Sequence, residues 1–179
     1  MRTAWVVVFV AVLLTGCGDL PSVEGIATKE NTVFDPALVG AWNAGDAVII
    51  VQAGEDKTSY AIHWVGAEGT ETPRFVRMEG TLVKLGEQRV LDLTAARQDA
   101  FSIPCHVFLR IRPADGGLKV QFIDSKWIRE QARSLPGFVQ DGHPVLTAPA
   151  VQVEGFLRKF GFEERALDDP ILLKALKQK

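Results

Sequence analysis

Apolar and polar residues alternate through most of the stretch from Trp42 to Asp124. The clearest runs of alternating apolar residues are Tyr60-Ile62-Trp64, Ile103-Cys105-Val107-Leu109-Ile111 and Leu118-Val120-Phe122. A period of two over five or more residues is typical of a β-strand with one buried face. Short Gly-rich turns separate these runs, and Asp115-Gly116-Gly117 is the strongest hairpin signal among them.

The alternation predicts six strands, with short segments at Trp42 and at Val145–Thr147 that could raise the number to eight. The six are Ala47–Gln52, Thr58–Val65, Arg74–Leu85, Arg89–Leu93, Ile103–Arg112 and Leu118–Asp124. Consecutive strands joined by short turns are normally neighbours, so we expect an antiparallel up-and-down meander. Its apolar face must be covered, either by closure into a barrel or half-barrel or by a helix. The fold class is therefore mainly β.

Helical spacing replaces the alternation toward the C-terminus. The expected helices are Ser125–Arg133, a second from Thr147 to Phe160, and a short last helix that starts at Asp169-Pro170. In the second, Val153, Phe156, Leu157 and Phe160 follow 3-4-3 spacing. This second helix should pack on the barrel wall or plug one end.

Residues 1–16 have the pattern of a secretory signal peptide. Arg2 precedes an apolar run of eleven residues, Ala4 to Leu14, which is shorter than the roughly 20 residues that a membrane-spanning helix needs. Leu14-Thr15-Gly16-Cys17 resembles the lipobox of bacterial lipoproteins. The resemblance implies that Cys17 becomes the lipid-modified N-terminus; the alternative is an ordinary cleaved signal with an incidental cysteine.

These patterns divide the chain into three expected segments. Residues 1–16 would be the lipoprotein signal peptide, residues 17–34 the lipidated cysteine with a flexible tether, and residues 35–179 a single β-rich domain with C-terminal helices. The stretch Gly18–Val33 carries Pro, Gly and mixed charges and shows neither period, which predicts the tether. In enteric-type lipoproteins, Asp after the cysteine favours the inner membrane, so Gly18 favours the periplasmic face of the outer membrane.

The body of the chain resembles known β-barrel proteins. Gly40-Ala41-Trp42 is similar to the Gly-x-Trp that starts the first strand of lipocalins. A group of functionally uncharacterised, lipocalin-like envelope proteins of Gram-negative bacteria also resembles it, on the following pieces: Leu38–Trp42, Leu91-Asp92-Leu93, Cys105–Ile111, Trp127, Leu146-Thr147-Ala148 and Phe156-Leu157. The resemblance implies a lipocalin-like barrel and no assigned activity.

Composition and candidate chemistry point away from catalysis. The net charge is −2, and acidic and basic residues are interspersed without a basic stripe, so nucleic acid is not an expected partner. His63, His106 and His143 lack metal-ligand spacing, so neither a metal nor another cofactor is predicted. Asp141 and His143 invite a catalytic pairing, but no nucleophile motif accompanies them.

Alternation also suggests where several other polar residues lie. Cys105 should belong to the buried set of its strand, and Asp92, between two leucines, should lie on the outer face. Arg110 and Arg112 are expected to be a surface pair, with an anion site as the alternative.

Two functions remain open, together with a less favoured third, a hydrolase. The protein could bind a small apolar ligand or lipid in its barrel while the anchor holds it at the membrane. Alternatively, it could be an envelope docking or assembly module with a filled core. The discriminating residues are the large apolar side chains expected to face or line the interior. For ligand binding these are Trp42, Tyr60, Trp64, Phe75, Phe108 and Phe122.

We predict that membrane-extracted protein begins at a lipidated Cys17. Its intact mass should exceed that of the chain from residue 17 by the mass of the acyl groups, and Cys17→Ala should lack this increment. Recovery of an unmodified mature form from the wild type would contradict the prediction.

Overall fold

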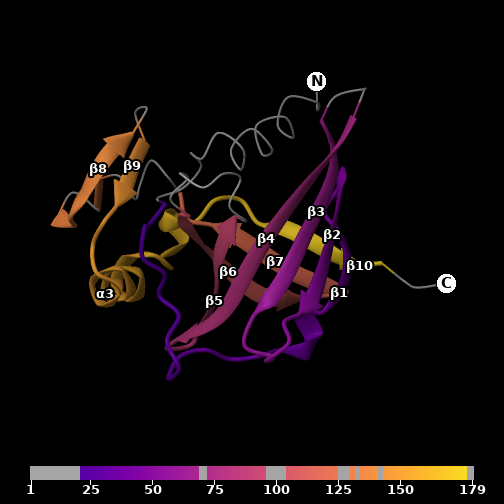
Figure 1. The fold of residues 1–179 in the computed structure, drawn as a ribbon, viewed down its shortest axis with the longest axis horizontal. Coiled ribbons are helices and arrows are strands. Elements are labelled where there is room, and N and C mark those ends of the chain that lie inside the picture. The colour runs from indigo at the N-terminus through magenta and orange to yellow at the C-terminus, as the bar shows by residue number, and fades with distance from the viewer. Residues whose placement is uncertain are drawn as a thin grey trace.

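The computed structural model describes residues 21–68, 72–95, 104–124, 130–131, 134–140 and 143–176. Within these ranges, eight antiparallel strands close into a barrel (Figure 1). The barrel strands are β1 (Gly40–Asn43), β2 (Ala47–Ala53), β3 (Tyr60–Glu68), β4 (Thr72–Leu85), β5 (Gln88–Ala95), β6 (His106–Ala114), β7 (Gly117–Phe122) and β10 (Ile171–Ala175). The prediction of a mainly β, up-and-down barrel is confirmed.

The last strand closes the barrel, and it replaces a helix that the sequence suggested. β10 pairs with β7 on one side and with β1 on the other. The helix expected from Asp169-Pro170 is therefore wrong: Ile171 and Leu173 alternate toward the interior, and Leu172 between them is exposed. Val145–Thr147 was also misplaced. Its first two residues belong to β9 (His143–Leu146), which pairs with β8 (Gly137–Gln140) outside the barrel.

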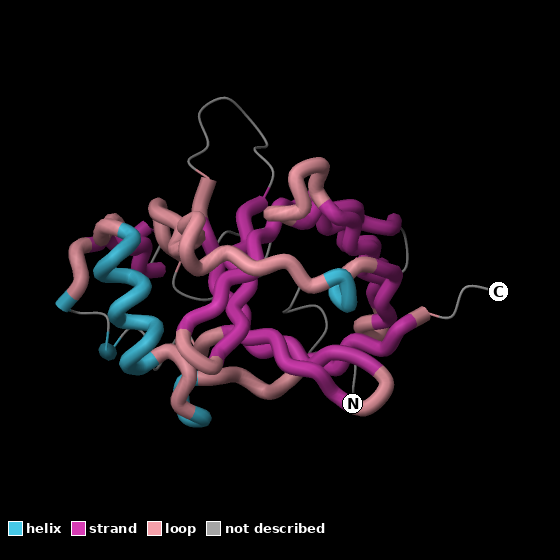
Figure 2. Tube along the Cα trace, turned by 90° about the horizontal axis from the view of Figure 1, so that it is seen from below, coloured by secondary structure: helices cyan, strands magenta, loops and turns pink. Residues whose placement is uncertain are grey.

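The two ends of the barrel differ, and we call them the closed end and the open end. A short 3-10 helix, η1 (Pro36–Leu38), lies at the closed end (Figure 2). Asp35 caps η1 by accepting from Ala37 N at 2.8 Å, and Trp42 Nε1 donates to the Leu38 carbonyl at 3.0 Å. Because successive strands run antiparallel, the β1–β2 turn at 44–46 and the first residue of β6 are both at the opposite, open end, three strands apart around the barrel.

A second apolar layer covers the outer face of β4, β5 and β6. It is built by the helix α3 (Ala150–Phe160), by β9 and by residues that precede η1. Its buried side chains are Ile26, Val83, Leu85, Val90, Phe108, Ile123, Leu146, Ala148, Val153, Phe156 and Leu157. α3 therefore packs on the barrel wall, and it is the one complete α-helix among the described residues.

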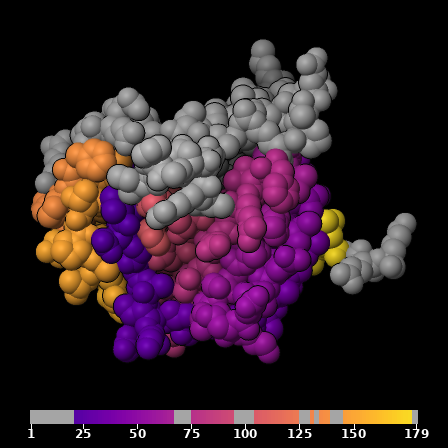
Figure 3. All heavy atoms as spheres, viewed as in Figure 1, coloured from indigo at the N-terminus to yellow at the C-terminus, as the bar shows by residue number. Residues whose placement is uncertain are grey.

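Residues 21–33 form part of this outer layer. Ser22 and Ile26 are fully buried, and the segment crosses the outside of the barrel between the wall and α3 (Figure 3). Its backbone is hydrogen-bonded to β6 by Ser22, to β9 by Val23 and to β4 by Val33. The expectation of a flexible tether is therefore wrong for residues 21–33. This segment has no regular hydrophobic period, but its apolar side chain Ile26 packs in the outer layer and its backbone is hydrogen-bonded to neighbouring strands.

Of the helix expected at Ser125–Arg133, the structure describes only residues 130–131, which are helical; the rest lies outside the described residues. None of the helices in the described part of the chain is long and apolar enough to span a membrane.

Barrel closure by β10 makes a testable prediction. A chain that ends at Asp169 should leave the edges of β1 and β7 unpaired, and unpaired edges promote aggregation. We expect this variant to lose cooperative urea unfolding and to elute from size-exclusion chromatography as higher oligomers. A chain that ends at Leu176 keeps β10 and should match the wild type; equal behaviour of the two truncations would show that closure is dispensable.

Candidate functional site

The barrel encloses a cavity of about 320 Å³. Its wall is almost entirely apolar. All eight barrel strands, together with η1 and the β1–β2 turn, supply the lining residues. The lining is Leu38, Trp42, Ala44, Asp46, Ala47, Ile49, Val51, Tyr60, Ile62, Trp64, Met78, Leu91, Leu93, Leu109, Ile111, Leu118, Val120, Phe122, Ile171 and Leu173. A space of this size and polarity suits a small apolar molecule.

The polar ends of two lining aromatics are used by the protein itself. Tyr60 accepts a hydrogen bond from Asp35 N at 2.7 Å, and burial raises the pKa of its hydroxyl. The indole N–H of Trp42 is held by the Leu38 carbonyl. Both aromatics thus turn their polar atoms toward the backbone at the closed end. The Trp64 indole N–H is buried without an acceptor among the described residues.

The open end is where the cavity reaches the surface. Asp46 is exposed and also lines the cavity, so the space extends to the outside beside the β1–β2 turn. Half-buried apolar residues of several strands pack against the core near this end, namely Ala44, Ile49, Val76, Val107 and Ile171. At the closed end, by contrast, Leu38 is 4% exposed and Tyr60 is 1% exposed.

Four of the six residues predicted to bind a ligand line the cavity: Trp42, Tyr60, Trp64 and Phe122. The other two lie outside the barrel. Phe108 is buried in the outer layer, and Phe75 is 63% exposed, where its ring stacks on His63. Both have the opposite strand parity to their inward neighbours Leu109 and Val76, so strand alternation places them on the outer face despite their size.

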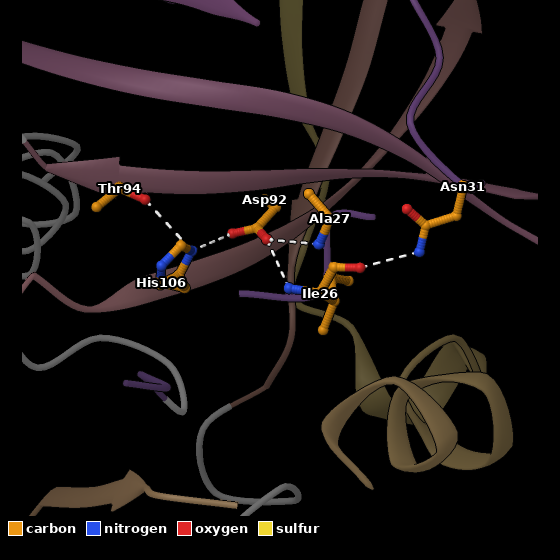
Figure 4. Close-up of polar contacts among 6 residues, drawn as sticks. All are labelled: Ile26, Ala27, Asn31, Asp92, Thr94 and His106. Carbon is orange, nitrogen blue, oxygen red and sulfur yellow. Dashed lines mark hydrogen bonds and ion pairs between the residues drawn. The ribbon is translucent and has the colours of Figure 1, made fainter. Parts of the chain in front are cut away.

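A buried polar cluster on the outer face centres on Asp92, which is 4% exposed (Figure 4). Its Oδ2 accepts from Ile26 N at 2.7 Å and from Ala27 N at 3.3 Å, and its Oδ1 lies 2.6 Å from His106 Nδ1. Alternation correctly put Asp92 on the outer face, but the N-terminal segment then buries it. Gly25 permits this approach, because a Cβ there would lie 2.8 Å from Asp92 Oδ2.

The same cluster lacks the geometry of a catalytic triad. A triad needs the carboxylate on one imidazole nitrogen and the nucleophile on the other. Here Thr94 Oγ1, at 3.3 Å, and Asp92 both face Nδ1 of His106. The carboxylate is also committed to two backbone N–H groups of the N-terminal segment. We interpret the cluster as a clamp that fixes residues 21–27 to the barrel.

Arg110 is buried rather than exposed. Its side chain is 3% exposed and donates from Nη2 to Gln121 Oε1 at 2.7 Å and to Glu164 at 3.2 Å. Gln121 in turn donates to the Asp168 carbonyl, which ties β7 to the chain that enters β10. The expected surface pair is thus wrong for Arg110, while Arg112 is exposed. Burial, and the neighbouring Asp124, raise the pKa of the Asp168 carboxyl to about 6.

The remaining candidates do not assemble into a site. His63 packs on Phe75 at the outer face, its Nδ1 buried without a partner in the described part of the chain. Cys105 is half-buried next to the start of β6. Asp141 lies outside the described residues. No three His, Cys, Asp or Glu residues within the described ranges are close enough together to hold a metal ion.

Comparisons with known proteins gave no match to any family model, curated protein or solved structure.

The clamp predicts a pH dependence of stability. The hydrogen bond that His106 donates to the Asp92 carboxylate raises the pKa of His106 above its usual 6.5, partial burial opposes this, and the charges of Asp92 and Glu24 reinforce it. Folding therefore gains stability from protonated His106 in full below about pH 6.5, and this gain is lost as the pH rises through the raised folded value. Between roughly pH 6 and pH 9, the free energy of unfolding measured in urea should fall by about 1 kcal/mol less in Asp92→Asn than in the wild type.

His63→Gln is the matched control, because it removes a half-buried histidine that has no carboxylate partner among the described residues. It should keep the wild-type pH dependence. A wild-type stability that does not fall relative to Asp92→Asn over this range would contradict the clamp as an ionic contact.

Proposed function

We propose that this protein is a non-catalytic lipoprotein of a Gram-negative envelope that binds a small apolar ligand or lipid in a lipocalin-like barrel. The anchor would be the lipidated Cys17, with the periplasmic face of the outer membrane as its location. The observation that carries the proposal is the cavity of about 320 Å³, lined almost wholly by apolar side chains.

The cavity favours binding over the alternative of a docking module with a filled core. A protein interior normally contains few voids larger than a water molecule, because unfilled space forfeits packing contacts. The volume here is at the lower end of the roughly 300–1,000 Å³ typical of small-molecule sites. Maintaining such a space inside a closed barrel is costly unless a ligand occupies it.

The arrangement of polar groups supports binding rather than turnover. Among the described residues, the titratable ones that line the cavity are Tyr60 and Asp46, and Asp46 lies at its mouth. The Asp92–His106 pair lies on the other side of the barrel wall, in contact with the N-terminal segment. The interior therefore offers shape and apolar surface, and such a site selects ligands mainly by size and hydrophobicity.

Two adjacent residues of β10 provide a matched test. Leu173 lines the cavity and is 7% exposed, whereas Leu172 faces outward and is 42% exposed. We expect the leaderless protein to bind N-phenyl-1-naphthylamine, a neutral apolar fluorophore, with enhanced emission. Leu173→Phe fills part of the cavity and should weaken binding about tenfold or more, which corresponds to a loss of at least about 1.4 kcal/mol of binding free energy. Leu172→Phe should bind like the wild type.

Thermal unfolding of both variants separates loss of the cavity from loss of the fold. Leu173→Phe should unfold within a few degrees of wild type, because the added ring enters empty space. Equal binding by both variants, each folded, would overturn the assignment of the cavity as the ligand site. Native mass spectrometry of protein isolated from its own envelope should show a co-purifying small lipid; a clean apo mass with one dominant cross-linked envelope protein would support docking instead.

A further inference from the structure

The first residues that the structure describes, Pro21 and Ser22, are attached to the outside of the barrel. Pro21 and Ser22 are buried, and their backbone is held on both sides. Ser22 N donates to the His106 carbonyl at 2.9 Å, and His106 N donates back to the Ser22 carbonyl at 2.7 Å. Leu146 N donates to the Pro21 carbonyl at 2.8 Å. Residue 21 is therefore fixed to the wall.

This fixed point lies at the open end of the barrel. His106 is the first residue of β6, and β6 begins at the end where the β1–β2 turn carries Asp46. From there the N-terminal segment runs along the outside toward η1 at the closed end (Figure 1). The chain thus enters the domain at the open end of the barrel, which is the opposite end from η1.

Chain length then limits how far the lipid site can be from the mouth. Only four peptide units separate Cys17 from Pro21, and an extended chain spans at most about 14 Å over that length. β2 alone extends about 23 Å over its seven residues. A lipid at Cys17 cannot reach past the closed end, because the anchor leaves from the other end of the barrel.

We propose that the open end of the barrel faces the membrane surface, so that the cavity receives an apolar chain directly from a bilayer lipid. This inference rests on the proposed anchoring at Cys17. Its second support is the chemistry of that end. Half-buried apolar residues line the approach to the cavity, and the exposed ring of Phe75 lies near the first residues of β4. Aromatic rings are favoured at membrane–water interfaces.

An apolar ligand gains from this orientation. A bilayer lipid that enters water exposes its apolar chains, and each exposed CH₂ makes the transfer less favourable. A mouth pressed against the headgroups lets the chain pass from one apolar phase to the other with less exposure. The anchor then sets direction as well as location.

The test compares two exposed acidic turn residues at opposite ends of the barrel. Asp46 lies at the open end and Asp115, in the β6–β7 turn, at the closed end. Asp46→Cys and Asp115→Cys, each in a Cys105→Ser background, are labelled with an environment-sensitive fluorophore in the full, lipidated protein. Vesicles of phosphatidylethanolamine and phosphatidylglycerol carry a nitroxide quencher on the headgroup. Quenching should be several-fold greater for the label at position 46 than at position 115.

A spacing variant provides the control. Insertion of about 16 Gly-Ser residues after Asp19 gives a tether with a root-mean-square span near 20–25 Å, which should abolish the difference between the two labels. Equal quenching at native spacing, or stronger quenching at position 115, would overturn the orientation. An intact mass without acyl groups at Cys17 would overturn it too. If the protein binds the naphthylamine but the two labels are quenched equally, only the proposed orientation is rejected, and the assignment of the cavity as the ligand site stands.

Discussion

The hydrogen-bonded seam that β10 makes with β1 and β7 is the interaction on which the rest of the structure depends. A sheet satisfies its backbone groups at every strand except the two at its edges, and only closure removes the edges. With β10 in place, the apolar face of every strand turns inward, and the interior becomes a separate compartment. Without it, the same strands would be an open sheet whose apolar face needs another cover. The cavity is a product of closure.

Closure also creates an outer surface that needs its own covering. On β4, β5 and β6, both faces carry apolar side chains, so a second layer packs against the wall from outside. The N-terminal segment belongs to this layer, and Asp92 holds it by accepting two backbone N–H groups while contacting His106. A buried carboxylate is tolerated here because its oxygens are occupied by donors. The clamp thereby ties the start of the domain to the strand at the cavity mouth.

The sequence predicted the features that depend on local alternation, and it failed where long-range packing decides. Strand positions from Ala47 to Phe122, the up-and-down order and three of the cavity aromatics, Tyr60, Trp64 and Phe122, follow from strand alternation. β10 was missed because five residues with adjacent leucines fit a helical turn as well as a strand, and only its two neighbours decide between them. The burial of Asp92 and Arg110 was unpredictable because distant segments cover them.

The seam between the first and last strands has a consequence for how the chain is made and folds. Trp42 pairs with Ala175, so the contact that completes the barrel joins residues about 130 positions apart. Such distant pairing is reached late and slowly, since the entropy of a long loop must be lost first. Until β10 has been synthesised, β1 and β7 have no partner at the seam, and the barrel cannot close. A polypeptide built this way can complete its barrel, and with it the cavity, only after β10 has been made.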